Sequence, residues 1–447
     1  MQERRHDFDV LVIGAGSAGF SAALAASQAG MRVGIIERGA LGGECPNRAC
    51  VPTKVLLQAS RLKSLGSAMS WKKAIGQTDS VKRVLTGNRL TSLLEKSGIV
   101  FLKGLARFAD PHSVVVGSHE WTASKFVIAG GTETAIPEIP GLKETGFLTY
   151  ADIVSLKVLP KSILILGGGP VAIEFAEILN GFGVKVTLIQ YADRVLEREE
   201  PEVSAVIEEA LRAKGVIIYT GAAAQIVARA KGIAKILVRQ GRMEFELSAE
   251  KILVATGKRS LAAEMMVERA GVELDPRGYI KTDKFLRTSV PHIFAAGDVK
   301  AGPQFTHVAT LDGEIVGQNL THKNLRAISY EVMPRATFCS PEVASVGKTE
   351  EQARASGKYK VGVGRAFFAG FGKALTHGDG IGLVKVVVDL KTGKILGAGI
   401  VGEDASEMIH ELALAMQVGA TYEDIANMMH VYPTGSETVK MACVNVE

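Results

Sequence analysis

Residues 8–37, FDVLVIGAGSAGFSAALAASQAGMRVGIIE, decide the fold class of this chain. The apolar run Val10–Ile13 predicts a strand, and residues 20–29 and 32–37 predict a helix and a second strand, which together make a βαβ unit. The turn between the first strand and the helix is a GxGxxG motif, Gly14, Ala15, Gly16, Ser17, Ala18 and Gly19. Its glycines let the backbone approach a pyrophosphate at the helix N-terminus, and Glu37 ends the second strand where it can accept from ribose hydroxyls. The stretch therefore predicts a dinucleotide-binding α/β fold.

An internal repeat of this unit covers residues 161–190. Its turn is Gly167, Gly168, Gly169, Pro170, Val171 and Ala172, in which alanine is an accepted variant of the third glycine. Gln190 stands where the first unit has Glu37, so no carboxylate repels a 2′-phosphate, and Arg194 or Arg198 would supply a positive partner. We therefore expect two dinucleotide sites, the second of which admits NADPH without excluding NADH.

Two of the four cysteines lie in the stretch GGECPNRACVPTK, residues 42–54. In an ideal helix, residues five positions apart are about 7.5 Å apart along the axis, beyond the usual Cα separation of a disulfide. A Cys45–Cys50 bond therefore needs a bend, which the glycines and prolines of the stretch permit. A disulfide that closes so small a loop adds little stability and is better suited to a reducible switch. Free or metal-binding thiols are the alternative, although CxxxxC is not a usual zinc spacing.

Length and composition set the broad class of protein. A chain of 447 residues with 49 glycines fits a multidomain α/β enzyme. Four cysteines argue against an extracellular disulfide framework, so we expect a reducing compartment, the cytoplasm. Lys54–Arg107 holds eleven basic residues and two acids, but no aromatic stacking motif accompanies them, which favours a solvated surface over nucleic-acid binding. No stretch is long and apolar enough to predict a membrane span.

The rest of the chain predicts the order of domains. Residues 55–96 are expected to be largely helical, and residues 251–258 and 280–298 are expected to form strands. Asp298, after the last of these, is placed either to bind a sugar-like hydroxyl or to cap a helix that begins near Val299. From residue 330 onward strands alternate with amphipathic helices, which predicts a separate α+β domain. The predicted segments are 1–150, 151–278, 279–329 and 330–447.

Six motifs occur in a fixed order along the chain: GAGSAG at 14–19, GGECPNRACVPTK at 42–54, GGGPVAIE at 167–174, ATG at 255–257, AAGD at 295–298 and YPTGSE at 432–437. With them the chain resembles the FAD-dependent pyridine nucleotide-disulfide oxidoreductases, which include dihydrolipoamide dehydrogenase, glutathione reductase and mercuric reductase. The resemblance implies an α/β fold with two Rossmann-like dinucleotide-binding domains and a C-terminal α+β dimerisation domain. FAD would lie on residues 1–150 and 279–329 and NAD(P)H on 151–278, and residues 330–447 would form a homodimer.

The same resemblance implies roles for individual residues. Electrons would pass from NAD(P)H to the Cys45–Cys50 disulfide by way of FAD, with Cys50 as the thiolate beside the flavin and Cys45 as the thiol that meets the acceptor. Lys54 and Glu174 match the family's ion pair near the flavin and the nicotinamide. The implied cofactor-binding residues are Gly14, Gly16, Ser17, Ala18, Gly19, Glu37, Gly43, Lys54, Gly167, Gly169, Gln190, Gly257 and Asp298, and no metal ligand is implied.

The C-terminal motif departs from that of the disulfide-reducing members. In those enzymes a histidine before Pro-Thr is the acid/base for thiol exchange and is held by a glutamate; here Tyr432 takes the histidine's place, although Glu437 remains. A tyrosine with an ordinary pKa of about 10 is a poor proton acceptor at neutral pH. Mercuric reductases carry a tyrosine there too, but they add a vicinal cysteine pair near the C-terminus, where this chain has the single Cys443. His430 is a weaker candidate for the base, and Cys339 is expected to be a buried apolar residue.

These observations predict an NAD(P)H-dependent FAD flavoprotein reductase that passes electrons through Cys45 and Cys50. The acceptor is expected to be a metal ion or a small molecule such as a quinone, and not an ordinary dithiol. Tyr432 and Glu437 are expected to complete the site of the partner subunit. A dihydrolipoamide dehydrogenase that works without the histidine is one alternative, and a flavin-bearing redox sensor without turnover is another.

Overall fold

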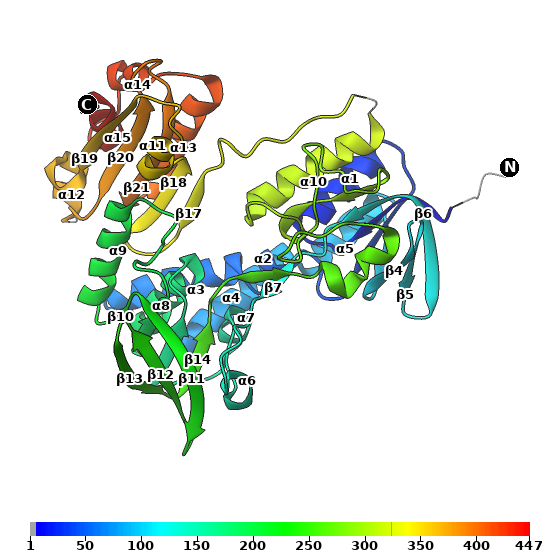
Figure 1. Ribbon diagram of the computed structural model, residues 1–447, viewed down its shortest axis with the longest axis horizontal. Helices are drawn as coiled ribbons and strands as arrows, with labels where there is room; N and C mark the ends of the chain where they lie inside the picture. The colour runs from blue at the N-terminus through cyan, green and yellow to red at the C-terminus, as the bar shows by residue number, and fades with distance from the viewer. Residues whose placement is uncertain (1–5, 323, 379) are drawn as a thin grey trace. The chain divides into compact units, whose positions relative to one another are not determined.

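The computed structural model describes residues 6–322, 324–378 and 380–447 (Figure 1). Its contacts divide the chain into two compact units, each made of three segments. Unit 1 comprises Met1–Val55, Ile75–Ala135 and Gly257–Tyr330. Unit 2 comprises Leu56–Ala74, Ile136–Thr256 and Glu331–Glu447. The sequence instead predicts four segments, with boundaries after residues 150, 278 and 329. Those boundaries stay a prediction.

Unit 1 is built on a sheet whose central strands are parallel. Its strands are, in order, β3 (Val100–Lys103), β2 (Val33–Glu37), β1 (Phe8–Ile13), β6 (His119–Ile128), β5 (Ser113–Val116) and β4 (Ala106–Asp110), with β16 (Ile293–Ala295) beside β6. In β1, Val12 lies opposite Ile35 of β2 and Val127 of β6. Parallel strands are usually covered on both faces of their sheet, which explains why residues 10–13 of the central strand β1 are all apolar.

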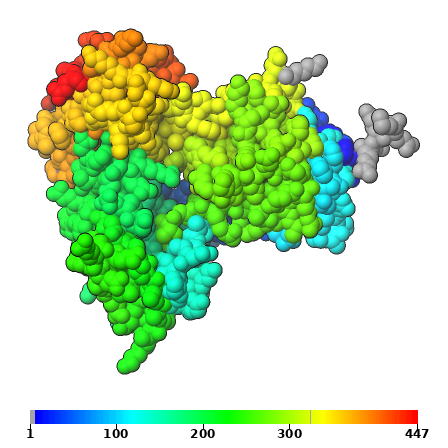
Figure 2. All heavy atoms as spheres, viewed as in Figure 1, coloured from blue at the N-terminus to red at the C-terminus, as the bar shows by residue number. Residues whose placement is uncertain are grey.

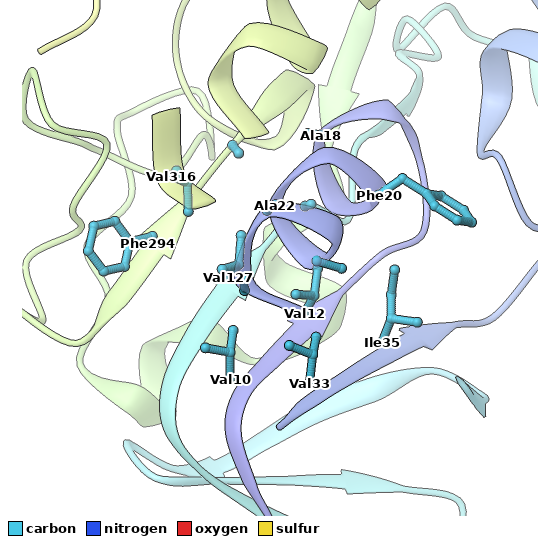
Figure 3. Close-up of a cluster of buried hydrophobic side chains, with 14 of the residues drawn as sticks. Val10, Val12, Ala18, Phe20, Ala22, Val33, Ile35, Val127, Phe294 and Val316 are labelled. Carbon is cyan, nitrogen blue, oxygen red and sulfur yellow. The ribbon is translucent and has the colours of Figure 1, made fainter. Parts of the chain in front are cut away.

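Two helices from opposite ends of unit 1's sequence pack on one face of that sheet, α1 (Ser17–Gln28) and α10 (Thr306–Thr321). Figure 3 shows Val10, Val12 and Val127 of the sheet meeting Ala22 of α1, with Val316 of α10 beside them. Glycine lets the two helices approach closely, because a Cβ on Gly313 would lie 2.2 Å from the carbonyl oxygen of Ala18. The first turn of α1, which carries the glycine motif, is thus fixed against both sheet and helix.

The second glycine motif lies in a parallel sheet of unit 2 with the order β10 (Ile217–Tyr219), β9 (Lys185–Ile189), β8 (Ser162–Leu166) and β14 (Lys251–Val254). The helices α8 (Pro170–Gly181) and α9 (Pro201–Ala213) connect its strands. The predicted repeat of the βαβ unit is therefore confirmed. An antiparallel sheet of β11 (Ala222–Ala230), β12 (Ile233–Gln240) and β13 (Met243–Ala249) was not expected, and the β11–β12 turn protrudes from it as a narrow tip (Figures 1 and 2).

The C-terminal part of unit 2 is an antiparallel sheet covered by helices, which confirms the predicted α+β domain. The strand order is β17 (Arg335–Thr337), β18 (Glu342–Gly347), β21 (Ile395–Gly402), β20 (Leu383–Asp389) and β19 (Val361–Phe367). The helices are α11 (Glu350–Ala355), α12 (Gly372–His377), α13 (Ala405–Val418), α14 (Tyr422–Asn427) and α15 (Ser436–Val444). Buried residues of β18, β20 and β21 form one core with α13 and α15.

Helices also follow the first βαβ unit, as the sequence predicts: α2 (Glu44–Asn47), α3 (Cys50–Ser64), α4 (Trp71–Leu85) and α5 (Gly87–Lys96). The shorter elements are α6 (Leu142–Thr145), α7 (Tyr150–Ile153), β7 (Thr132–Thr134), β15 (Lys258–Ser260) and the 3-10 turns η1 (Ala262–Met265), η2 (Val267–Ala270), η3 (Gly297–Val299) and η4 (Phe368–Gly370). Across the described ranges, none of the helices combines the length and the apolar character that crossing a bilayer requires.

The prediction of strands throughout residues 280–298 was mostly wrong, because only Ile293–Ala295 forms a strand there. Asp283 explains part of the difference. Its Oδ1 accepts hydrogen bonds from the backbone N–H groups of Phe285 (2.8 Å) and Arg287 (3.0 Å). Aspartate side chains that bond nearby backbone groups compete with sheet pairing and favour turns.

Candidate active site

The cysteine stretch is bent between its two cysteines, as the spacing predicts. Helix α2 ends at Asn47 and α3 begins at Cys50, so the two thiols belong to different helices. Asn47 holds the bend, since its amide Nδ2 donates to the carbonyl oxygens of Leu41 (2.9 Å) and Gly43 (2.8 Å). A turn of this kind brings residues five positions apart closer than a continuous helix would.

The surroundings of the two thiols shift their pKa values in opposite directions, which makes them chemically different. All four cysteines of the chain lie among the described residues and carry free thiols. The hydrogen bond from Cys45 lowers the pKa of the Cys50 thiol to about 6, against the effect of burial. The same bond, together with burial, raises the pKa of Cys45. Both shifts favour a charged Cys50 beside an uncharged Cys45.

Three further groups of unit 1 act on Cys50. The hydroxyl Oγ1 of Thr306, the first residue of α10, lies 3.4 Å from the Cys50 Sγ and lowers its pKa. The positive charges of Lys54, one turn along α3, and Lys258, on β15, lower it further. Lys258 in turn pairs with Asp298, with 3.2 Å between Nζ and Oδ2. Cationic surroundings and a helix N-terminus are features of reactive cysteines.

The first glycine motif forms a tight turn in which added side chains would clash with the backbone. Gly14 has a φ of +104°, and a Cβ on Gly19 would lie 1.8 Å from the Gly14 carbonyl oxygen. Helix α1 begins at Ser17, not at Phe20 as the sequence suggested, so Ser17, Ala18 and Gly19 form its first turn. Their backbone N–H groups therefore lie at the helix N-terminus, where a pyrophosphate binds.

The loop of the cysteine stretch closes against this turn. A Cβ on Gly43, whose φ is +68°, would lie 2.7 Å from the Cα of Gly16. Glu37 is oriented at the end of β2 because its Oε2 accepts a hydrogen bond from the Ala15 N–H (2.9 Å). A bare backbone cradle at a helix N-terminus, an oriented acid and an adjacent dithiol would suit FAD. That its pyrophosphate would lie on Gly14–Gly19 and its ribose near Glu37 stays a prediction.

Asp298 lies inside the short turn η3, and α10 begins only at Thr306, so it does not cap a helix that begins at Val299. Its Oδ2 accepts from the Thr132 hydroxyl (3.3 Å) and is paired with Lys258. A contact between Asp298 and a cofactor hydroxyl stays a prediction.

The second glycine motif repeats the first in unit 2. Gly167 has a φ of +112°, and a Cβ there would lie 2.4 Å from the Ala255 carbonyl oxygen. Gly169 precedes α8 and has open space where a Cβ would stand. Gln190 is buried, packs against Gly168 and donates through Nε2 to the Arg194 carbonyl oxygen (3.4 Å). This turn fits a dinucleotide, and Gln190 leaves both nicotinamide coenzymes open.

Three expected residues are divided between the units. Lys54 and Gly257 belong to unit 1, whereas Glu174 belongs to unit 2. Glu174 is buried on α8, and its Oε1 accepts a hydrogen bond from the Phe338 N–H (3.0 Å). The expected Lys54–Glu174 ion pair and the expected role of Gly257 stay predictions.

The C-terminal motif lies at the surface of its own domain. The Tyr432 side chain is exposed, with 74% of the residue accessible to solvent. Glu437, in the first turn of α15, accepts through Oε2 from the Thr434 N–H (3.1 Å). The His430 imidazole is only 4% exposed, and its Nε2 lies 2.9 Å from the Glu411 Oε1. His430 is thus already paired inside the domain, which agrees with its lower rank as a base.

The two remaining cysteines are buried. Burial raises the pKa of Cys443 to about 12 and raises that of Cys339 well above its usual value. Burial thus favours the uncharged thiol at both positions, in contrast to Cys50. In the part of the chain that the structure describes, no group of three or more histidine, cysteine, aspartate or glutamate side chains is arranged to hold a metal ion.

Sequence reasoning missed Thr306 and Lys258 as neighbours of Cys50. Lys258 follows the Gly257 turn directly, and that position was the available signal. Thr306 follows the AAGD motif by eight residues and carries no signal of its own, because only the packing of α10 on α1 brings it to the thiol.

Comparison with known proteins agrees with this site. A family model described as pyridine nucleotide-disulphide oxidoreductase matches residues 8–313, and the model of that family's dimerisation domain matches residues 333–443. The chain therefore belongs to the class I pyridine nucleotide-disulfide oxidoreductases, enzymes that depend on FAD and take electrons from NAD(P)H. The predicted fold class, two Rossmann-like domains and a C-terminal α+β dimerisation domain, is confirmed.

The relatives that match nearly the whole chain have different activities in their names. A mercuric reductase of Staphylococcus aureus is 34% identical over 99% of this chain and 83% of its own length. A dihydrolipoyl dehydrogenase of Chlorobaculum tepidum is 36% identical over 97% of this chain and 96% of its own. The HOCl-induced flavoprotein disulfide reductase RclA from Escherichia coli, solved as a Cu(II) complex, matches with a TM-score of 0.91 at 30% identity, over 98% of this chain and 99% of its own.

Proposed function

We propose that this flavoprotein reductase passes electrons through Cys45 and Cys50 to an acceptor other than an ordinary dithiol, with a soft metal ion as the leading candidate. The observation that carries the proposal is the C-terminal motif, in which Tyr432 replaces the acid/base histidine and Glu437 is bonded to the Thr434 N–H. Bound FAD supplies the two-electron transfer between nicotinamide and the disulfide.

Proton transfer separates the two kinds of acceptor. Exchange with a dithiol substrate requires a base to take the substrate's protons, and a tyrosine with an ordinary pKa of about 10 serves poorly near pH 7. A soft metal ion needs thiolate ligands instead. The pKa of Cys50 is lowered, which favours its thiolate, and Cys45 releases its proton when the metal binds. As the Cys45–Cys50 disulfide re-forms, the pair gives up two electrons, which reduce one Hg(II) to Hg(0) or two Cu(II) to Cu(I).

The names of relatives support both acceptor classes to different degrees. A mercuric reductase is among the relatives that match nearly the whole chain, and RclA was solved with Cu(II). Dihydrolipoyl dehydrogenases of similar identity keep dithiol turnover as the second candidate. A sensor without turnover is not supported, because the family consists of enzymes.

We also propose that the active form is a homodimer in which Tyr432 and Glu437 face the site of the partner subunit. The matched dimerisation domain supports a homodimer. Several large apolar residues of this domain are exposed in the single chain, as expected for a surface that a second copy covers: Leu414, Val418, Met429, Val431 and Tyr432.

An acceptor panel tests the proposal. The holoenzyme is assayed for NADPH and NADH oxidation with Hg(II), Cu(II), a quinone and lipoamide in parallel. We expect turnover with a metal ion that Cys45→Ser abolishes, and slow turnover with lipoamide. Rapid lipoamide turnover with no metal-dependent oxidation would favour dihydrolipoamide dehydrogenase and contradict the proposal.

A further inference from the structure

We infer that Thr306 is a positioning residue for the redox pair, whose hydroxyl donates a hydrogen bond to the Cys50 sulfur and keeps the negative charge on that sulfur. The inference rests on the proposed role of Cys50 as the thiolate of the pair. It assigns a function to the first residue of α10, which belongs to none of the six motifs.

The geometry gives the hydrogen bond its direction. The Thr306 Oγ1 and the Cys50 Sγ are 3.4 Å apart, within the range of hydrogen bonds to sulfur. A thiolate has no proton to give, so in the charged form the hydroxyl must be the donor. Thr306 is the first residue of α10, so the positive end of this helix lies beside the Cys50 sulfur. Phe305, the residue before it, has no side-chain group that could cap the helix.

The position of Thr306 is fixed from both sides along the chain. One turn further on, the Thr310 hydroxyl donates to the Thr306 carbonyl oxygen (3.0 Å). On the other side, Gln304 donates through Nε2 to the Tyr279 hydroxyl (3.0 Å), and that hydroxyl donates to the Lys258 carbonyl oxygen (2.7 Å). This chain of bonds ties the start of α10 to β15, the strand that places Lys258 near Cys50.

The charged and titratable groups that act on Cys50 come from four elements. Cys45 of α2 donates a hydrogen bond, Lys54 of α3 and Lys258 of β15 contribute positive charge, and Thr306 of α10 contributes its hydroxyl. His307 follows Thr306, but its ring stacks on Phe305 with 5.5 Å between the ring centroids. Thr306 is therefore the hydroxyl donor of the set, and the same hydroxyl also lowers the pKa of Cys45. Its effect can be separated from that of the cations by a substitution that preserves shape.

The test is the pH dependence of Cys50 alkylation in the reduced holoenzyme. Iodoacetamide reacts with the thiolate, which forms a carbon–sulfur bond and displaces iodide. Trypsin cleaves after Arg48, so Cys45 is recovered in the peptide of residues 39–48 and Cys50 in that of residues 49–54. Mass spectrometry of the two peptides then gives a separate titration curve for each thiol. The variants are Thr306→Val, which keeps the shape, Thr306→Ala, as a second variant without the hydroxyl, and Thr306→Ser, which keeps the donor.

We expect the midpoint for Cys50 to rise by roughly one pH unit in Thr306→Val and Thr306→Ala, the size expected for loss of one hydrogen bond to a charged group. Thr306→Ser should remain near the wild type. The matched control is Thr321→Val, the same change in the last turn of α10, which leaves Thr306 and the hydrogen bonds that place it unchanged.

Two results would overturn the inference. One is an unchanged Cys50 midpoint in a correctly folded, FAD-loaded Thr306→Val or Thr306→Ala enzyme. The other is an equal shift in Thr321→Val, which would assign the effect to the helix and not to the hydroxyl. A wild-type midpoint near the ordinary thiol value of about 8.5 would instead contradict the thiolate role of Cys50 on which the proposed function depends.

Discussion

At the scale of residues, the chemistry depends on an unequal pair of thiols. Cys50 gains its charge first from the hydrogen bond that Cys45 donates, and then from Thr306, Lys54 and Lys258. Burial opposes that charge and, for Cys45, adds to the effect of the hydrogen bond in keeping the proton in place. One thiol is thus ready to carry charge next to a cofactor, and the other is ready to react once it loses its proton.

This inequality predicts how Cys45→Ala affects the pH profile of Cys50. The pKa of Cys50, about 6, lies below that of an ordinary thiol, so its thiolate fraction rises as pH rises through about 6. Removing the donor should move that midpoint upward by about one to two pH units. Alkylation of the 49–54 peptide across pH measures it, and a midpoint that stays near 6 in the variant would remove Cys45 as the main cause.

Tyr432 carries the second prediction at this scale. Tyr432→His should raise turnover on dihydrolipoamide by about a hundredfold, because it restores a positioned acid/base. The gain should disappear in Tyr432→His/Glu437→Gln, since the carboxylate would hold the imidazole. Steady-state rates with NAD⁺ and dihydrolipoamide measure both, and rapid wild-type turnover that the histidine leaves unchanged would count against the proposed acceptor.

At the scale of elements, close packing between α1 and α10 places both the glycine motif and Thr306. Gly313→Ala would put a Cβ 2.2 Å from the Ala18 carbonyl oxygen, in a helix whose φ is ordinary. We expect a loss of about 1–3 kcal/mol in the free energy of unfolding, as for other overpacked sites. Gly76→Ala in α4 is the control, because its Cβ meets open space and alanine favours a helix. The midpoints of thermal unfolding of the two variants measure the difference in stability. Equal midpoints would mean that α1 and α10 can move apart without loss of stability.

The sequence was sufficient for elements whose signals are local. The two βαβ units were predicted because apolar runs and glycine turns follow one another within thirty residues. The bend between Cys45 and Cys50 was expected because a disulfide at that spacing requires one and the neighbouring glycines and prolines permit it. The antiparallel sheet at 222–249 was missed although Met243–Ala249 alternates apolar and polar residues, a period that indicates a strand. The irregular segment before Ile293 was missed because its turn depends on side-chain hydrogen bonds of Asp283, which leave no period in the sequence.

The candidate site was predictable only where one short segment supplies it. Cys45 and Cys50 are five positions apart, whereas Thr306 and Cys50 are separated by 256 residues. Lys258 likewise reaches the site from a distant strand. Contacts of this kind follow from how the sheet and α10 pack, and no motif in a single sequence encodes them.

At the scale of the whole molecule, unit 2 joins its nucleotide sheet to the C-terminal domain through a buried ionic cluster. Lys385 of β20 is 3% exposed, and its Nζ contacts Glu200 (2.9 Å), Glu202 (2.6 Å) and Glu350 (2.8 Å). Burial alone would raise the pKa of Glu350, but hydrogen bonds from Lys385 and Arg354 lower it to about 2. The stability that Glu350 contributes is therefore present above its ordinary pKa and is lost as pH falls toward 2.

Removing the cation should destabilise this unit. Lys385→Met leaves the buried Glu200 carboxylate without its paired cation. We expect the free energy of unfolding to fall by roughly 3 kcal/mol or more. The exposed Lys391 provides the matched control, because Lys391→Met should change stability by less than about 0.5 kcal/mol. The midpoint of thermal unfolding at neutral pH compares them, and an equal effect of the two changes would show that the cluster adds no stability.

The central claim is that electrons from NAD(P)H reach the Cys45–Cys50 pair through FAD. Anaerobic titration of the purified holoenzyme with NADPH, followed by absorbance, tests it most directly. The account predicts a long-wavelength band from a thiolate against the flavin, which Cys50→Ser abolishes and Cys45→Ser retains. A reduced enzyme without that band, or a band that survives in Cys50→Ser, would contradict it.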